Sequence, residues 1–145
     1  MTALPPIAEL VPHTGRMSLL DELLAFDGSR VTCRVTLRPE STFVEAGEVE
    51  AVVALEYMAQ AVAVFAGMKG RADGNPVRIG YLLGTRELLL RADRFTVGDE
   101  LMVEAVHVWG EDQLGVFDCK VSRRGVEVAC ATLNVYQGPL EEQPS

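Results

Sequence analysis

The sequence predicts an α+β domain in which a curved antiparallel sheet wraps around one long helix. Three observations lead to this fold class. One segment is apolar on every side and rich in helix formers, most of the remaining chain alternates like β-strands, and short turn signals link the later strands in series. With 145 residues the chain is long enough for one domain. We expect that domain to span residues 1–138, followed by a flexible acidic tail at 139–145.

The predicted helix runs from about residue 49 to residue 69. Between residues 51 and 68 the only charged side chain is Glu56 and the only amide is Gln60, and the remaining residue types include many strong helix formers. A helix that is apolar on all sides either spans a membrane or is enclosed by protein. The run is at the short limit for a span and carries Glu56 and Gln60 in its first half, so we expect a core helix.

Two strands are predicted before this helix. Residues 18–26 and 31–37 are rich in apolar and β-branched side chains, and they are separated by a loop that begins Asp27-Gly28. An Asp-Gly pair between two such runs is a strong hairpin signal.

The remaining strands are predicted after the helix. A polar loop at 72–76 precedes residues 77–90, which are long enough for one bent strand or two. Three further runs follow with short turns between them and predict an antiparallel meander: 100–109, 114–122 and 126–136. The run at 100–109 is apolar on both faces, as expected of a central strand or a subunit interface. Because a single sheet cannot cover both sides of an apolar helix, we expect a dimer.

Composition excludes several classes of function. The net charge is −8, which disfavours binding to nucleic acid and to anionic membranes. The three cysteines, Cys33, Cys119 and Cys130, lie in apolar runs without metal-ligand spacing, so we interpret them as core residues of a protein in a reducing compartment. The two histidines cannot build a three-histidine metal site. The N-terminus lacks the basic and apolar regions of a signal peptide, and we expect a cytoplasmic protein.

Glu56 is the leading candidate for chemistry. A carboxyl group on a buried helix is either functional, with its pKa raised toward that of a general acid, or it lies on the one face of the helix that meets solvent. Gln60 follows at i+4 and shares that face, so the two side chains are close enough to form a hydrogen bond.

His13 is the second candidate. It follows Pro12 in a loop before the first predicted strand, where a histidine can act as a proton shuttle or be an ordinary surface or capping residue. His107 lies within the predicted strand at 100–109, and we interpret it as a packing or interface residue.

Three motifs resemble the bacterial 3-hydroxyacyl-acyl-carrier-protein dehydratases. Leu10-Val-Pro-His-Thr-Gly-Arg-Met-Ser-Leu-Leu-Asp21 is similar to the opening of that family, Leu55-Glu-Tyr-Met-Ala-Gln-Ala61 to its central helix, and Phe95-Thr-Val-Gly-Asp-Glu-Leu101 to the turn into its later strands. The resemblance implies the hotdog fold, in which a curved antiparallel sheet surrounds one long helix. It also implies that the protein eliminates water from a 3-hydroxyacyl thioester, with Glu56 as the general acid and Gln60 supporting it.

The sequence differs from these dehydratases in one position of their catalytic pair. In those dehydratases a histidine precedes the helix and pairs with the glutamate across the dimer, whereas the stretch at 41–47 contains none. The pattern is closer to a divergent branch that occurs in aryl polyene and related fatty-acid-like pathways. Our hypothesis is that His13 supplies the missing base. A substrate tunnel would be apolar, with these candidate lining residues: Tyr57, Met58, Phe65 and Leu82. The reaction needs no metal and no redox cofactor.

Two other functions fit the same motifs. A hotdog thioesterase would use the helix carboxylate to activate water, and a non-catalytic hotdog subunit would bind an acyl carrier or pair with an active dehydratase. The expected partners are an acyl carrier protein or a coenzyme A thioester, together with a second subunit in a homodimer or heterodimer. An acidic carrier would require a basic patch, for which the candidates are Arg86, Arg91, Arg94, Arg123 and Arg124.

Overall fold

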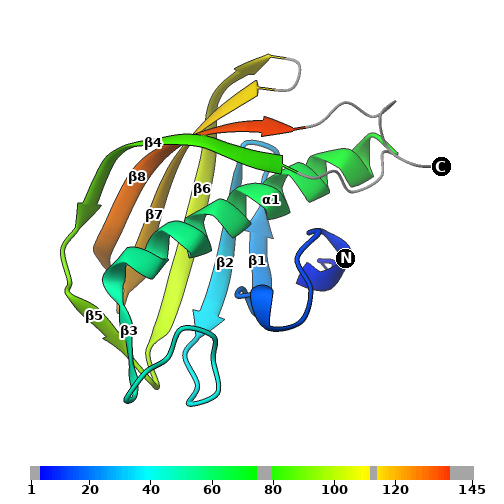
Figure 1. Ribbon diagram of the computed structural model, residues 1–145. Helices are drawn as coiled ribbons and strands as arrows, with labels where there is room; N and C mark the ends of the chain where they lie inside the picture. Colours follow the sequence, from blue (N-terminus) through cyan, green and yellow to red (C-terminus); the bar gives the residue numbers. More distant parts are fainter. Residues whose placement is uncertain (1–3, 75–79, 112–113, 138–145) are drawn as a thin grey trace.

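The computed structural model describes residues 4–74, 80–111 and 114–137. A six-stranded antiparallel sheet, in the order β1-β2-β6-β7-β8-β4, curves around helix α1, and β3 and β5 form a small second sheet (Figure 1). The predicted fold class is therefore confirmed. The elements are β1 (Glu22–Phe26), β2 (Arg30–Thr36), β3 (Glu48–Glu50), α1 (Ala54–Ala72), β4 (Gly80–Leu90), β5 (Arg94–Thr96), β6 (Glu100–Glu111), β7 (Leu114–Arg123) and β8 (Val126–Gln137).

Helix α1 occupies the centre of the fold, but its ends differ from the prediction. A single 3-10 turn, η3 (Ala51–Val53), precedes it, and the helix continues to Ala72. Val49 lies instead in β3, where it pairs with Phe95 of β5 and both side chains are buried. Burial of this pair outweighs the helical propensity of the residues around it.

Helix α1 packs against the sheet as a core helix. With its preceding turn it is long and apolar enough to cross a membrane by length and composition, yet more than half of that stretch is buried inside the protein. Its contacts extend from β1 across to β8. The expectation of an enclosed helix rather than a membrane span agrees with this packing.

The meander after the helix is confirmed. Strand β7 pairs with both β6 and β8 in antiparallel register, and β6 pairs on its other side with β2. Strand β6 is thus a central strand. Its inward side chains Leu101, Val103 and Ala105 are fully buried, while Val108 and Trp109 at its far end are exposed.

Strand β4 forms one edge of the sheet. It pairs with β8 through two register shifts, so the predicted segment is one bent strand, although residues 75–79, which include its expected start, lie outside the described residues. The expected tail at 139–145 also lies outside them. The described part of the sheet places no strand on the outer side of β4. Several of its leucines are exposed: Leu82, Leu83, Leu89 and Leu90.

The residues before β1 lie along one flank of α1. The Glu9 carboxylate forms an ion pair with Arg71 at 3.1 Å near the helix C-terminus. A Cβ atom at Gly67 would overlap the backbone carbonyl of Leu10, so the chain can approach the helix only because residue 67 is glycine. The expected strand at 18–26 begins later, at Glu22, because the Leu19 N–H donates to the Gln60 side chain of α1 instead of to a neighbouring strand.

The thiols and His107 serve packing. Cys33 and Cys119 are buried and free, and burial raises the pKa of each to about 12, while Cys130 is half-buried. His107 packs against the rings of Phe65 and Phe117, with centroid distances of 5.5 and 4.9 Å, and these two rings also contact each other at 5.2 Å.

Candidate functional site

Glu56 lies in the first turn of α1 on the face of the helix that the sheet leaves open. Its side chain is exposed and forms no ion pair or hydrogen bond with a described residue. Val52, one turn earlier on the same side, is also exposed, and Ala59 and Ala63 farther along are half-buried. In the single chain, the carboxylate thus belongs to a solvent-facing stripe of small and apolar residues, which is the second of the two interpretations considered above.

Gln60 is buried and binds the backbone of the N-terminal segment. Its Nε2 donates to the carbonyl oxygen of Met17 at 2.6 Å, and its Oε1 accepts from the N–H of Leu19 at 2.8 Å. Both atoms of the amide are therefore occupied, and neither bonds to Glu56 in this structure. The expectation of a direct Glu56–Gln60 hydrogen bond is corrected because position i+4 on this helix has already turned into the core.

His13 lies along α1 between two contacts that position the N-terminal segment. Leu10 contacts Gly67, and Met17 is held by Gln60, so the segment that carries His13 connects two points on α1. Glu56 is one turn before Gln60, roughly 6 Å along the helix axis from the Gln60 contact. The Nδ1 atom of His13 is buried and has no hydrogen-bond partner among the described residues. No hydrogen bond or ion pair joins His13 to Glu56 among the described residues.

Three of the four candidate tunnel residues are buried in the core, and the fourth is exposed. Met58 is fully buried in the core, and Phe65 belongs to an aromatic cluster with Phe26 and Phe117. Leu82 is exposed on β4. Tyr57 is 1% exposed, and burial raises its pKa to about 12. Of these four residues, Tyr57 lines the pocket described next.

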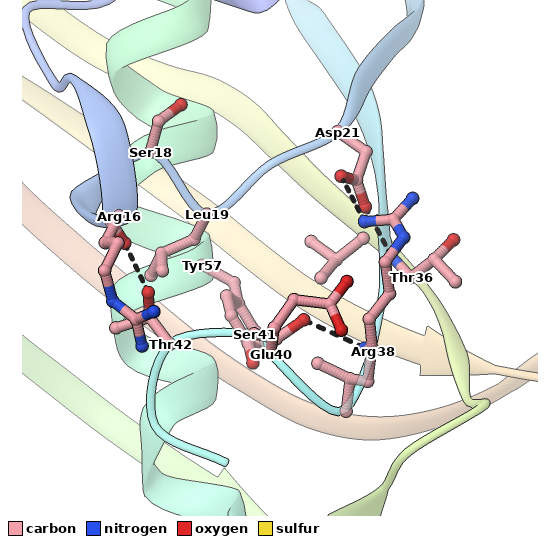
Figure 2. A pocket seen from close by; sticks show the side chains of 12 residues that line it. Arg16, Ser18, Leu19, Asp21, Thr36, Arg38, Glu40, Ser41, Thr42 and Tyr57 are labelled. Atoms are coloured by element: carbon pink, nitrogen blue, oxygen red, sulfur yellow. Dashed lines mark hydrogen bonds and ion pairs between the residues drawn. The ribbon is translucent and has the colours of Figure 1, made fainter.

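A polar pocket beside the start of α1 was not predicted. It has a volume of about 190 Å³ and is lined by part of the N-terminal segment, the end of β2 and the residues that follow it, the loop around Ser41 and Tyr57 (Figure 2). The lining residues of the N-terminal segment are Arg16, Ser18, Leu19 and Asp21. The Oη atom of Tyr57 is buried and has no hydrogen-bond partner among the described residues. Because these segments are far apart in sequence, only the folded chain brings them together.

The loop before the helix is held in an unusual backbone conformation. Phe43 and Ala46 have φ angles of 76° and 52°, in the left-handed region that favours glycine. The Thr42 Oγ1 donates to the carbonyl oxygen of Arg16 at 2.5 Å and ties this loop to the N-terminal segment. Non-glycine residues in this region are strained, and such strain is concentrated at functional sites. Two residues beside this contact, Met17 and Phe43, expose apolar side chains.

The proposed basic patch is largely neutralised within the chain. Arg94 forms ion pairs with Glu48 and Glu50, Arg123 with Asp99 and Arg91 with Glu127. Arg86 and Arg124 are exposed and form no ion pair with a described residue. Across the described residues, no group of three potential metal ligands is found.

Comparison with known proteins indicates a family. The sequence profile described as "ApeP-like: ApeP dehydratase" matches residues 5–144. Among solved structures, one titled the dehydratase heterocomplex ApeI:P from Xenorhabdus doucetiae is similar with 27% identity and a TM-score of 0.91, covering 97% of this chain and 95% of that chain. A search of curated proteins finds no match.

More distant structures share only the fold. A hypothetical thioesterase with coenzyme A from Streptococcus pneumoniae is 14% identical, with a TM-score of 0.64 and coverage of 82% of this chain and 86% of that one. The Escherichia coli PaaI protein from the phenylacetic acid degradation operon is 13% identical, with a TM-score of 0.62 and coverage of 79% and 81%.

Proposed function

The chain belongs to the ApeP dehydratase family, and from this premise we propose that it eliminates water from a 3-hydroxyacyl thioester with Glu56 as the general acid. The observation that carries the proposal is the position of Glu56. Its carboxylate lies in the first turn of the central helix, unpaired with any described residue, on a face bordered by exposed apolar side chains. A substrate or a second subunit that covered this face would exclude water from the carboxyl group.

The proposed reaction moves two protons. A base removes the C2 proton, which the thioester carbonyl makes acidic, and the Glu56 carboxyl donates a proton to the C3 hydroxyl as it leaves as water. The developing enolate oxygen requires hydrogen-bond donors. The turn at Ala51 begins without a side-chain cap, so we propose that backbone N–H groups at this positive end of the helix provide them.

His13 remains the proposed base. Its Nδ1 is buried and unpartnered among the described residues, so the imidazole has a nitrogen available for a proton. Within one chain, however, no hydrogen bond or ion pair between described residues joins His13 to Glu56. We therefore propose that the pair forms only when the N-terminal segment moves or when a second subunit contributes one of the two groups.

A second hotdog subunit is the proposed partner. Edge strand β4 is 11 residues long and exposes several leucines, whereas natural proteins usually cover or interrupt such an edge. The open face of α1 around Glu56 also has no cover from described residues. The similar solved structure is titled a heterocomplex, which supports pairing with a different subunit as well as with a second copy.

The substrate carrier is proposed to be an acyl carrier protein, with coenzyme A as the alternative. Arg86 and Arg124 are the two arginines of the predicted patch whose charges no described carboxylate neutralises, so they are the residues we propose to contact an acidic carrier. We place this soluble enzyme in the cytoplasm.

A non-catalytic subunit is the second candidate function. The observation that favours it is the loop at 41–47, which contains no histidine, together with the unpaired state of Glu56 in the isolated chain. In that case this chain would bind the acyl carrier or stabilise an active partner. A thioesterase is a third interpretation, which the product of the reaction distinguishes.

The test follows the mass of a 3-hydroxyacyl thioester incubated with the chain alone and with a second hotdog dehydratase subunit from the same organism. Loss of one water is expected, and Glu56→Gln should reduce the rate about 10²- to 10⁴-fold. Glu100→Gln, which neutralises another exposed carboxylate on β6, is the matched control and should retain the rate.

Other results of this experiment would favour one of the alternative functions. Full dehydration by a folded Glu56→Gln variant would contradict the catalytic role, and dehydration that required the second subunit would then favour the non-catalytic subunit. Release of the free acid would indicate a thioesterase. If a His13→Ala variant retains the wild-type rate, His13 is not the base, and the proposed role of Glu56 is unaffected.

A further inference from the structure

The buried hydroxyl of Tyr57 lacks the partner that such groups normally have. The residue is 1% exposed, and its Oη finds no hydrogen-bond partner among the described residues. A buried polar group without a hydrogen bond is destabilising, so phenylalanine would be the more stable choice at this position. A hydroxyl retained there at such a cost indicates that something else in the functioning protein accepts its proton.

The pocket described above is where that acceptor would lie. The Tyr57 side chain extends from α1 toward the loop that carries Ser41 and Thr42 (Figure 2). Ser41 Oγ accepts a hydrogen bond from the N–H of Arg38 at 2.9 Å and still has its own proton to donate. Since burial raises the pKa of Tyr57 to about 12, its phenol remains a donor at neutral pH.

The charges around the pocket favour a neutral ligand. Two arginines, Arg16 and Arg38, and two carboxylates, Asp21 and Glu40, line it and balance in number. The Asp21 carboxylate is already occupied, because it forms an ion pair with Arg38 at 3.1 Å and accepts from the N–H of Thr36 at 2.6 Å. No excess of positive charge is therefore available to hold a carboxylate or a phosphate.

The remaining walls of the pocket are apolar. Leu19, Val35 and Leu37 contribute to the lining together with the Tyr57 ring. At about 190 Å³ the pocket is smaller than a site for a whole drug-sized ligand, so it fits one end or one section of a longer molecule.

We propose that this pocket binds a neutral oxygen acceptor, a carbonyl or hydroxyl group on an apolar stem, and that the Tyr57 hydroxyl donates a hydrogen bond to it. The ligand identity rests on the proposed function, because a 3-hydroxyacyl thioester offers this chemistry in two places. Apart from the thioester carbonyl and the C3 hydroxyl, which belong to the reacting unit, one place is an amide of the pantetheine arm, and the other is an oxygen substituent at the far end of the acyl chain. Tyr57 is then a positioning residue on the helix face next to that of Glu56, about 100° around the axis.

The experiment measures binding by calorimetry to the full chain, alone and with its partner subunit. The probes have saturated acyl chains, which cannot be dehydrated: an acyl pantetheine, the matching N-acetylcysteamine thioester without the second amide, and an acyl pantetheine with a terminal hydroxyl. Tyr57→Phe is expected to weaken binding about five- to tenfold. Tyr136→Phe, which removes the same group from β8 outside the pocket, should bind as the wild type does.

The pattern across the probes identifies the source of the oxygen. A loss confined to the pantetheine probes assigns the pocket to the second amide of the arm, and a loss confined to the probe with the terminal hydroxyl assigns it to the acyl end. Unchanged binding of every probe by Tyr57→Phe would overturn the proposal.

Stability provides an independent test. Tyr57→Phe should raise the urea midpoint of the unliganded protein, because it removes an unpaired buried hydroxyl. A lowered midpoint would show that the hydroxyl is already bonded, for example to water, and would overturn the proposal. The pocket and the proposed function can also fail separately. If the wild-type protein dehydrates no substrate but its binding of a probe still depends on Tyr57, the proposed function is wrong and the proposed pocket stands.

Discussion

Gln60 shows how the hydrogen bonds of one buried residue can determine the geometry of a pocket. Its amide joins the central helix to the N-terminal segment through two short hydrogen bonds, to Met17 and Leu19. Two residues of that segment close to these hydrogen bonds, Arg16 and Leu19, line the polar pocket. The orientation of this wall of the pocket therefore depends on a buried amide in the helix.

We predict that Gln60→Met destabilises the protein by about 2–4 kcal/mol, because the Leu19 N–H and the Met17 carbonyl lose their partner in a buried region. Urea unfolding measures the loss, and hydrogen exchange at the Leu19 amide should become faster. If stability and exchange both stayed at wild-type values while activity fell, Gln60 would act directly on the reaction instead.

The buried thiols predict a loss of stability in alkaline solution. Burial raises the pKa of Cys33 and of Cys119 from 9.0 to about 12, so the folded protein holds both protons where the unfolded chain releases them. The stabilisation is complete below pH 9 and declines as the pH rises from 9 toward 12. Urea midpoints at pH 8 and pH 10.5 should show this decline, and Cys33→Ala should make it shallower. A midpoint that did not change with pH would contradict the prediction.

The sequence was sufficient to predict Glu56 as a candidate catalytic residue, but it was not sufficient to predict the polar pocket. Glu56 stood out because it is the only charged residue between residues 51 and 68, and that pattern is local. The role of the Tyr57 hydroxyl depends on how closely the loop at residues 38–42 approaches α1 in the folded chain. A sequence pattern contains no information about that distance, so Tyr57 was interpreted only as an apolar lining residue.

Among the helices and strands, the long elements were predictable from the sequence and the short ones were not. The helix and the meander extend over ten or more residues each, enough for their periodicity to be recognised. Strands β3 and β5 have three residues each, and they form because Val49 and Phe95 bury one another. Such a pair is a tertiary contact, which explains why the helix was predicted to begin at Val49.

The packing of the N-terminal segment on α1 predicts an unusual effect for a glycine in a helix. Replacing a helical glycine by alanine normally stabilises a protein by about 1 kcal/mol. Gly67→Ala should instead destabilise this protein by about 1–3 kcal/mol, because the new methyl group would overlap the Leu10 carbonyl. Thermal unfolding distinguishes the two signs. A gain in stability would mean that the segment does not lie against the helix as the structure has it.

At the scale of the whole molecule, the two uncovered surfaces have one explanation. The sheet encloses one side of α1 and leaves the side with Glu56 open, while β4 presents an apolar edge without a described neighbour. A second subunit that added a strand to β4 would extend the sheet and shield both surfaces from water. The sequence already indicated a dimer, because one sheet cannot cover both sides of an apolar helix.

Charges placed on the β4 edge should therefore prevent this association. We predict that the double substitution Leu83→Lys and Leu89→Lys weakens pairing at least tenfold, since lysine on an edge strand discourages strand addition. The two side chains are 61% and 50% exposed, so the fold of the single chain should remain intact.

Light scattering during gel filtration, with the chain alone and with a second hotdog subunit, measures the effect. Val108→Lys is the matched control, because Val108 is 50% exposed and lies on β6, which β7 and β8 separate from that edge. If the control impaired assembly and the double variant did not, the partner would bind another face of the sheet. Glu56 would then have to be covered by the substrate or the N-terminal segment, and dehydration should proceed with the chain alone.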